Sequence, residues 1–452
     1  FWRRHCHYQP NTRGTCHAND DQYTRRNSDR PGADCFTDPL TNGHPLADGN
    51  GHLFAYRYGD IHADAASAHR HPRATDGDGS ARTGINAGLR CGCGPDWRVA
   101  DRLVGFHRRG GGTRRLPGLC SQPAASMSDV DVLIVGAGAA GLAAAAALRD
   151  VGRIVAIVDK GRSPGGRLAT RRLGGGRADH GAQFFTVRSP RFGTIVAEWR
   201  AVGLVYEWSR GWADGSLLAA PSDGYPRYAA RGGFSALAKH LAKGLDVRLN
   251  TRLLAVRRSG GGWVAEGEGG DSIAASALLL TAPVPQSLAL LAAGGVALPA
   301  AEREALAQVA YGPCLCGLFV VDGDVHLPEP GALQRPGYPV SWIADNRRKG
   351  ISPERRVVTV HAGANASDAR WDNADEAVLE WLLQELLPFL GTDAVVAESQ
   401  LKRWRYAVPT QLYPARCFIS TMDAPLALAG DAFDGPRVEG AFLSGWAAAL
   451  AL

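Results

Sequence analysis

The stretch that decides the fold runs from Asp131 to Asp159 and opens with Asp-Val-Leu-Ile-Val-Gly-Ala-Gly-Ala-Ala-Gly. Its apolar run at 132–135 suits a strand that is buried on both faces, and a second such run covers 154–158. Between the two lies an alanine-rich segment with helical character at 142–149. Three glycines in G-x-G-x-x-G spacing join the first strand to the helix: Gly136, Gly138 and Gly141. The pattern predicts a parallel strand–helix–strand unit.

Each part of this unit has a physical role in holding a dinucleotide. Gly136 permits the tight turn off the strand, Gly138 lets the backbone approach a pyrophosphate, and Gly141 lets helix and strand pack closely. The helix offers free N–H groups and a partial positive charge to the phosphates from its first residues, Ala139 and Ala140. Asp159 stands where an acid accepts hydrogen bonds from a ribose hydroxyl. The alternative, a glycine-rich turn that binds nothing, is disfavoured by the strand, helix and acid at these distances.

The composition of the 452-residue chain limits the class of protein. At about 150 residues per domain, this length suggests two or three domains. The formal net charge is +6, of which residues 1–126 contribute +5, because they hold 17 Arg and 12 Asp but neither Lys nor Glu. The remainder is close to neutral, so nothing indicates binding of nucleic acid. No apolar run approaches the roughly 18 residues of a membrane span, and the N-terminus lacks the apolar core of a signal peptide.

Residues 1–126 differ in kind from the rest of the chain. They contain nine of the 13 His and six of the nine Cys, and they show no sustained helical or strand period. The first methionine, Met127, comes directly before the first strand. We therefore expect 1–126 to be upstream sequence translated into protein, or a disordered leader, with Met127 as the natural start. A zinc module is the rival interpretation, but Cys91-Gly-Cys93 and Cys6-His7 match no paired zinc-ligand spacing, so no metal site is predicted.

The cysteines of the remaining chain bear on its compartment. There are only three of them, at scattered positions: Cys314, Cys316 and Cys417. This usage is typical of a reducing environment and not of a disulfide framework, so we expect a cytoplasmic location.

Two further motifs follow Asp159. The first begins at Lys160 and ends in Gly165-Gly166-Arg167, which suits a loop whose backbone and guanidinium both meet phosphate; a solvated basic loop is the alternative. The second is Arg177-Ala-Asp-His-Gly-Ala-Gln-Phe-Phe-Thr-Val-Arg188, a strand-like run that mixes an acid, an imidazole, an amide and two aromatic rings. Such a mixture is more typical of the wall of a site than of a core strand.

Together with the glycine fingerprint, these two motifs resemble the renalase-like branch of the flavin amine oxidases, over most of 127–452. The resemblance implies FAD as cofactor and an α/β fold. That fold is a Rossmann-type FAD-binding domain with a parallel sheet and an inserted α+β substrate domain of mixed sheet and helices. The expected FAD-binding domain is discontinuous and comprises 127–188, 226–283 and 420–452. The substrate domain comprises 189–225 and 284–419.

The last signal lies near the end of the sequence, from Leu426 onward. An apolar strand ends at Gly430-Asp431, and a helix begins near Val438. In flavoproteins of this type, the matching Asp binds the ribityl or phosphate region, and the helix N-terminus points at the pyrimidine end of the flavin. The resemblance therefore implies cofactor-binding residues at both ends of one FAD: Gly136, Gly138, Ala139, Ala140, Gly141, Asp159, Lys160, Gly166 and Arg167 at one end, and Gly430, Asp431, Arg437, Val438 and Glu439 at the other.

No catalytic residue is assigned from the sequence, because hydride transfer to a flavin requires no Ser/His/Asp or paired-carboxylate constellation and none stands out. Several residues are candidates for a pocket facing the flavin, with a purely structural role left open for each: Gln183, Phe184, Thr186, Trp212, Tyr225, Trp342, His361 and Asn365. Lys349 lies in a polar Asn346-Arg-Arg-Lys-Gly loop, which argues against its being the flavin-adjacent lysine of many amine oxidases.

Three functions follow from this interpretation. The first is a renalase-like oxidase that takes a hydride from isomeric dihydro-NAD(P), returns NAD(P)+ and reduces O2 to hydrogen peroxide. The second is an amine oxidase or desaturase of the same superfamily. The third, of a different class, is a flavin-binding protein without turnover. In each case the expected partners are small molecules and not nucleic acid or membrane, and the sequence does not specify the oligomeric state.

Overall fold

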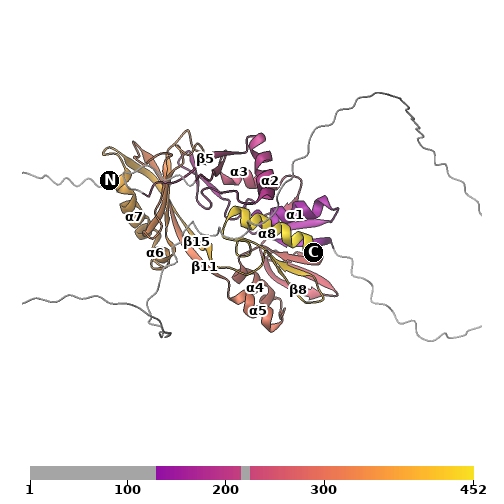
Figure 1. The fold of residues 1–452 in the computed structure, drawn as a ribbon. Coiled ribbons are helices and arrows are strands. Elements are labelled where there is room, and N and C mark those ends of the chain that lie inside the picture. The colour runs from indigo at the N-terminus through magenta and orange to yellow at the C-terminus, as the bar shows by residue number, and fades with distance from the viewer. Residues whose placement is uncertain (1–128, 215–223) are drawn as a thin grey trace, which may run out of the picture. The chain divides into compact units, whose positions relative to one another are not determined.

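The structure, a computed structural model, describes residues 129–214 and 224–452, which all belong to one unit of the chain, Arg57–Leu452 (Figure 1). The expectations for the leader 1–126 and for the start at Met127 lie outside the described residues. Within the described part, no helix combines the length and the apolar character needed to cross a bilayer.

The nucleotide-binding part is built on an eight-stranded sheet with the order β16-β17-β10-β1-β2-β7 and a β8–β9 hairpin attached to β10. The four parallel pairs within it confirm the predicted Rossmann-type arrangement. The strands are β1 (Val130–Val135), β2 (Val155–Val158), β7 (Asp246–Arg248), β8 (Leu253–Ser259), β9 (Gly262–Gly267), β10 (Ser272–Leu280), β16 (Phe418–Ile419) and β17 (Leu426–Leu428).

Both faces of this sheet are covered, which explains the continuous apolar runs of its central strands. On one face, Val132 and Ile134 of β1 join a hydrophobic cluster with α1 (Ala139–Asp150), α3 (Phe234–Leu241) and α8 (Val438–Ala451). On the other face, Leu133 and Val135 pack with the β8–β9 hairpin, α4 (Val284–Ala293) and α5 (Ala300–Ala307). Successive side chains of a strand point to opposite faces, so one short run serves both clusters.

Helices α1 and α8 lie side by side and approach very closely (Figure 1). A Cβ atom on Gly445 of α8 would lie 2.0 Å from the carbonyl oxygen of Ala140, and one on Gly141 would lie 2.0 Å from that of Gly136. The Ser444 hydroxyl also accepts a hydrogen bond from the N–H of Gly430 at 2.9 Å. The N-terminal and C-terminal motifs are therefore packed against one another through glycine contacts.

The second sheet is antiparallel, with five strands in the order β12-β13-β14-β11-β15. These strands are β11 (Ala310–Asp322), β12 (Ala332–Gln334), β13 (Val340–Asp345), β14 (Val357–Ala362) and β15 (Val395–Gln411). One face packs on α7 (Asp375–Leu386), which the 3-10 turn η1 (Leu387–Phe389) follows, and α6 (Ala364–Asp368) lies beside β11. The other face meets Leu173 and Ala178 of the hairpin β3 (Thr170–Leu173) and β4 (Gly176–Asp179). This face therefore looks toward the segment that follows the glycine loop.

Helix α2 (Pro190–Ala201) departs from the predicted domain boundary at 189–225. The Ser189 side chain caps it, as its sequence favours, and it buries Phe192, Val196 and Trp199 in the same cluster as β1 and α1. This packing assigns α2 to the nucleotide-binding part. The sequence could not show this, because amphipathic spacing indicates that a helix has a buried face but not which neighbour covers that face. The next strands, β5 (Val205–Ser209) and β6 (Arg227–Ala230), pair with each other.

Two further local predictions were wrong. The run 177–188 was read as one strand, but strand structure ends at Asp179 and continues only as an isolated bridge between Phe185 and Tyr228. The 17-residue strand β15 was not recognised, because charged residues, Pro409 and exposed positions interrupt the apolar alternation of this edge strand.

The α1–α8 contact predicts a specific sensitivity at Gly445. Replacing Gly445 with Ala forces the two helices apart, and we expect a loss of about 1–3 kcal/mol in the free energy of unfolding. Urea unfolding followed by circular dichroism measures it. The matched control is Gly261→Ala, where a Cβ atom meets nothing within 4 Å. Equal stability of both variants would show that the helices separate without cost.

Candidate functional site

The glycine turn after β1 contains two glycines that the protein itself requires and one that it does not. Gly136 has φ +111°, and a Cβ atom there would lie 2.6 Å from Oγ1 of Thr281, whose hydroxyl donates to the carbonyls of residues 135 and 136. Gly141 packs on the same turn. Gly138, in contrast, has φ −78°, and a Cβ atom there would meet nothing within 4 Å. The space beside Gly138 is therefore open to a ligand.

The helix that starts at this open space is suited to an anion. Gly138 is the N-cap of α1, and no side chain among the described residues caps the helix, so the first-turn N–H groups, including those of Ala139 and Ala140, are available. Helix α8 is also uncapped at Arg437, whose buried Nε has no partner in the described part of the chain, and Val438 is its first residue. Two uncapped N-termini and one unpaired guanidinium nitrogen fit the phosphates and polar ring edge of an extended dinucleotide.

Asp159 at the end of β2 is held in place by the chain. Its Oδ2 accepts the N–H of Ala137 at 2.7 Å, and its Oδ1 accepts that of Gly161 at 2.6 Å. Each carboxylate oxygen has a second lone pair, so the group can still accept a ribose hydroxyl. Lys160 is exposed, and its Nζ reaches only Gln286, at 3.5 Å.

The predicted Arg167 and Asp431 form one unit. The guanidinium donates to both carboxylate oxygens, at 2.5 and 2.7 Å, and also to the carbonyl of Ala407 at 3.0 Å. Gly166 has φ +55°, and its backbone lies against Gly138. Residues about 264 positions apart in sequence, predicted at opposite ends of the cofactor, are thus joined by a two-point ion pair.

The side chain of Glu439, a predicted cofactor-binding residue, is engaged within the chain. The residue is 2% exposed, and its carboxylate accepts the N–H groups of Arg188 and Ser189 at 2.7–3.2 Å. Its side chain therefore attaches the first turn of α8 to the start of α2. Gly430 is placed by its bond to Ser444.

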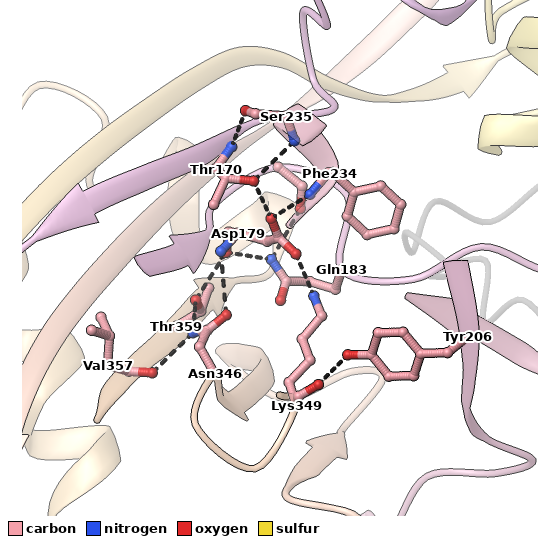
Figure 2. A network of polar contacts seen from close by, with 11 residues as sticks. Thr170, Asp179, Gln183, Tyr206, Phe234, Ser235, Asn346, Lys349, Val357 and Thr359 are labelled. Atoms are coloured by element: carbon pink, nitrogen blue, oxygen red, sulfur yellow. Dashed lines mark hydrogen bonds and ion pairs between the residues drawn. The ribbon is translucent and has the colours of Figure 1, made fainter. Parts of the chain in front are cut away.

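A buried hydrogen-bond network surrounds Asp179, which belongs to the second sequence motif, 177–188 (Figure 2). Oδ1 accepts the N–H of Phe234 at 2.9 Å, at the N-terminus of α3, and the Thr170 hydroxyl at 2.5 Å. Oδ2 accepts the Lys349 ammonium at 2.7 Å. The main chain of the same residue is also engaged: its N–H donates to Asn346, and its carbonyl accepts from Gln183 and Thr359.

Lys349 is buried although the loop around it is polar. In the sequence, the polar loop argues against a flavin-adjacent lysine; in the structure, the residue is 1% exposed and its side chain is completely buried. Its Nζ lies 4.9 Å from the Trp208 ring centroid and 5.3 Å from that of Phe234, and its carbonyl accepts the Tyr206 hydroxyl. Burial lowers the pKa of the ammonium, and the charge and hydrogen bond of Asp179 oppose that shift. No local signal pairs residue 349 with residue 179.

Three of the predicted pocket residues come together. Phe184, Trp212 and Trp342 form an aromatic cluster with Trp208, with ring centroids 4.7–6.1 Å apart. Gln183 is adjacent in sequence to Phe184. Buried polar atoms here have no partner among the described residues: Nε1 of Trp212 and of Trp342, and Oε1 of Gln183. Such atoms are costly unless a ligand or water satisfies them, so this wall is a candidate substrate surface.

His361 extends this wall. It lies opposite Trp342 on β14, and its Nε2 is also buried without a described partner. His180 follows Asp179; it stacks on Trp404 at 5.4 Å, and its carbonyl accepts the Trp404 indole N–H at 2.8 Å. Burial lowers the pKa of His180 to about 3 and that of His361 to about 4, with nearby positive charges adding to both shifts. Both imidazoles are therefore neutral at pH 7.

The other three predicted pocket residues lie apart from this wall. Tyr225 is 57% exposed, and Asn365 is exposed on the short helix α6. Thr186 is half-buried and is not part of the aromatic cluster. Their loop-like or polar sequence context suggested a cavity but could not distinguish one from the outer surface.

Comparison with known proteins agrees with this arrangement. Residues 134–199 match an NAD(P)-binding Rossmann-like domain, and residues 204–452 match the family of flavin containing amine oxidoreductases. The chain belongs to this family of flavin-dependent oxidoreductases, and its cofactor is FAD.

Solved structures share the fold at low sequence identity. Cyclohexylamine oxidase from Brevibacterium oxydans IH-35A has 16% identity and a TM-score of 0.55, over 72% of this chain and 98% of that one. A putrescine oxidase bound to putrescine has 16% identity and a TM-score of 0.54, over 71% of this chain and 98% of that one.

The open space at Gly138 predicts that a larger residue at this position abolishes flavin binding without changing the stability of the FAD-free protein. A Cβ atom at residue 138 meets no protein atom within 4 Å, so we expect the unfolding free energy of FAD-free Gly138→Val to stay within about 0.5 kcal/mol of the wild type. The side chain fills the space required by the pyrophosphate, so the purified protein should be colourless. Absorbance at the flavin bands measures this, with Gly261→Ala as a yellow control. A full flavin content in Gly138→Val would contradict the site.

The Asp179–Lys349 pair predicts a non-additive stability effect. Lys349→Met leaves a buried carboxylate without its cation and should cost about 3–5 kcal/mol in unfolding free energy. The double variant Asp179→Asn/Lys349→Met should be clearly more stable than that single variant, since Asn still accepts from Phe234 and Thr170. The exposed Lys243→Met serves as control. Additive losses in urea unfolding would disprove a coupled pair.

Proposed function

We propose that this FAD-dependent oxidoreductase is a renalase-like oxidase of dihydronicotinamides. An isomeric dihydro-NAD(P) would give up one hydride and become NAD(P)+. The two electrons, with one proton from solvent, would then reduce O2 to hydrogen peroxide. When bound, FAD supplies the hydride acceptor at N5 and the site of reoxidation.

The observation that carries this proposal is that the described residues of the candidate wall include no free group basic enough to remove a proton from the substrate. His180 and His361 are neutral, with pKa values lowered to about 3 and about 4, so they do not retain a proton at neutral pH. The acid of this segment, Asp179, is engaged by Lys349, Thr170 and the backbone. A dihydronicotinamide needs no base, because its ring is neutral and its C–H bond is already hydridic.

An amine substrate places different demands on the same wall. A protonated amine must lose a proton before it can be oxidised, and the wall residues offer only two weakly basic imidazoles for that step. It also could not accept a hydrogen bond from the unpaired indole N–H groups of Trp212 and Trp342, whereas a carbonyl could. These contacts favour a neutral donor that carries an acceptor atom.

The amine oxidase or desaturase function remains the second candidate, because the family and two of the similar solved structures are named for amines. A flavin-binding protein without turnover does not agree with membership in this family of oxidoreductases.

In either case, the residues of the chain would orient the substrate and exclude water from the site. The aromatic cluster of Phe184, Trp212 and Trp342 would exclude water from the reacting C–H bond. Gln183, oriented by its amide bond to the carbonyl of Asp179 at 2.7 Å, would present its free Oε1 to a donor group of the substrate.

Stopped-flow reduction of the bound flavin separates the two candidates. The FAD-loaded protein is mixed anaerobically with borohydride-treated NAD+, which contains the dihydro isomers, or with putrescine or cyclohexylamine. We expect rapid bleaching with the dihydro isomers only, and one hydrogen peroxide per donor after air is admitted. Bleaching by an amine but not by the dihydro isomers would overturn the proposal.

A further inference from the structure

Two basic residues on different strands lie near His180, at the edge of the candidate wall. On β3, Arg171 is paired with Ala178 of β4, and Ala178 and Leu173 pack against Cys316 and Leu318 of the five-stranded sheet. Side chains of paired and alternate residues share one face of a hairpin, so Arg171 is directed to the same sheet.

Lys402 belongs to the five-stranded sheet that packs against this hairpin. It lies on the edge strand β15, paired with Cys316, and therefore on the sheet face that meets β3 and β4. Its Nζ lies 5.1 Å from the ring centroid of Trp404, the ring on which His180 stacks. The two cations thus flank the His180–Trp404 stack.

Neither cation is neutralised by the described part of the protein. Two neighbouring basic side chains, one on β4 and one on β15, have acid partners: Arg177 pairs with Glu354, and Arg403 pairs with Asp375. Arg171 and Lys402 are exposed and have no carboxylate within ion-pair distance among the described residues. The acid on the same face of β15, Glu398, lies four residues away, beside Gly174 at the β3–β4 turn.

His180 reports the resulting positive potential. Its imidazole is 8% exposed, and its Nδ1 has no partner among the described residues. Burial is the largest cause of its lowered pKa, and the charges of Lys402 and Arg171 add to it. Burial itself favours no charge of either sign, but the two nearby cations create a positive potential that favours an anion.

We propose that Arg171 and Lys402 form an anion subsite that binds the phosphate groups of the substrate, next to the His180–Trp404 stack. The inference rests on the proposed function, for which it specifies a phosphorylated donor over a free riboside or an amine. A guanidinium and an ammonium that converge from two strands suit the several oxygens of a pyrophosphate. This subsite is separate from the cofactor's own phosphate site, which the open space at Gly138 and the N-terminus of α1 provide.

Calorimetric titration tests the subsite without turnover. The FAD-loaded protein is titrated with inorganic pyrophosphate, with NAD+ and with nicotinamide riboside. Each of Arg171→Ala and Lys402→Ala should weaken binding of pyrophosphate and NAD+ by roughly tenfold, the value of one charge-assisted hydrogen bond, and should leave the riboside unchanged. Added salt should weaken pyrophosphate binding in the wild type and less so in the double variant.

Arg172→Ala is the matched control, because Arg172 is the exposed neighbour of Arg171 on β3 and is directed to the opposite face of the hairpin. Equal losses in Arg171→Ala and Arg172→Ala, or none in either, would overturn the subsite. Flavin reduction that is equally fast with dinucleotide and riboside would also overturn it while leaving the proposed function intact. If no dihydronicotinamide reduces the flavin but pyrophosphate binding still depends on Arg171 and Lys402, the subsite stands and the proposed function fails.

Discussion

The arrangement of the candidate site depends on the buried carboxylate of Asp179. Through Oδ1 it binds the N-terminus of α3 and the hydroxyl of Thr170, and through Oδ2 it binds Lys349. The three partners belong to the nucleotide-binding part, to β3 and to the loop after β13. One charged group therefore fixes segments that are up to 170 positions apart in sequence. Because His180 follows directly and Gln183 donates to the carbonyl of Asp179, the same contacts position the candidate wall.

A buried ion pair is a costly way to join two parts of a protein, since its desolvation offsets most of the Coulombic attraction. An apolar pair at 179 and 349 could pack with similar stability but without a defined direction. We interpret the pair as a means of fixing geometry, because hydrogen bonds between defined atoms set the orientation of the wall. The aromatic contacts of Lys349 with Trp208 and Phe234 give the ammonium a partly favourable surrounding.

The nucleotide-binding part could be predicted from the sequence because its signals are local. Gly136, Gly138 and Gly141 lie within six residues, and the strands beside them are apolar throughout. The wall could be predicted only in part. Phe184 and Trp342 lie in one aromatic cluster, whereas Tyr225 lies at the surface. Lys349 was missed because the burial of a charge depends on a distant partner, and no periodicity within one segment reports such a pairing.

Gly138 has a consequence for the evolution of such chains. The glycines at 136, 141 and 445 are required by contacts within the polypeptide, whereas no such contact in the described part of the chain requires the glycine at 138, which we propose is set by the bound cofactor. Selection for a stable fold and selection for a bound cofactor therefore act on different positions of the same short motif. A descendant that lost its flavin could accumulate larger residues at 138 while retaining the other three, and that pattern would identify it from sequence alone.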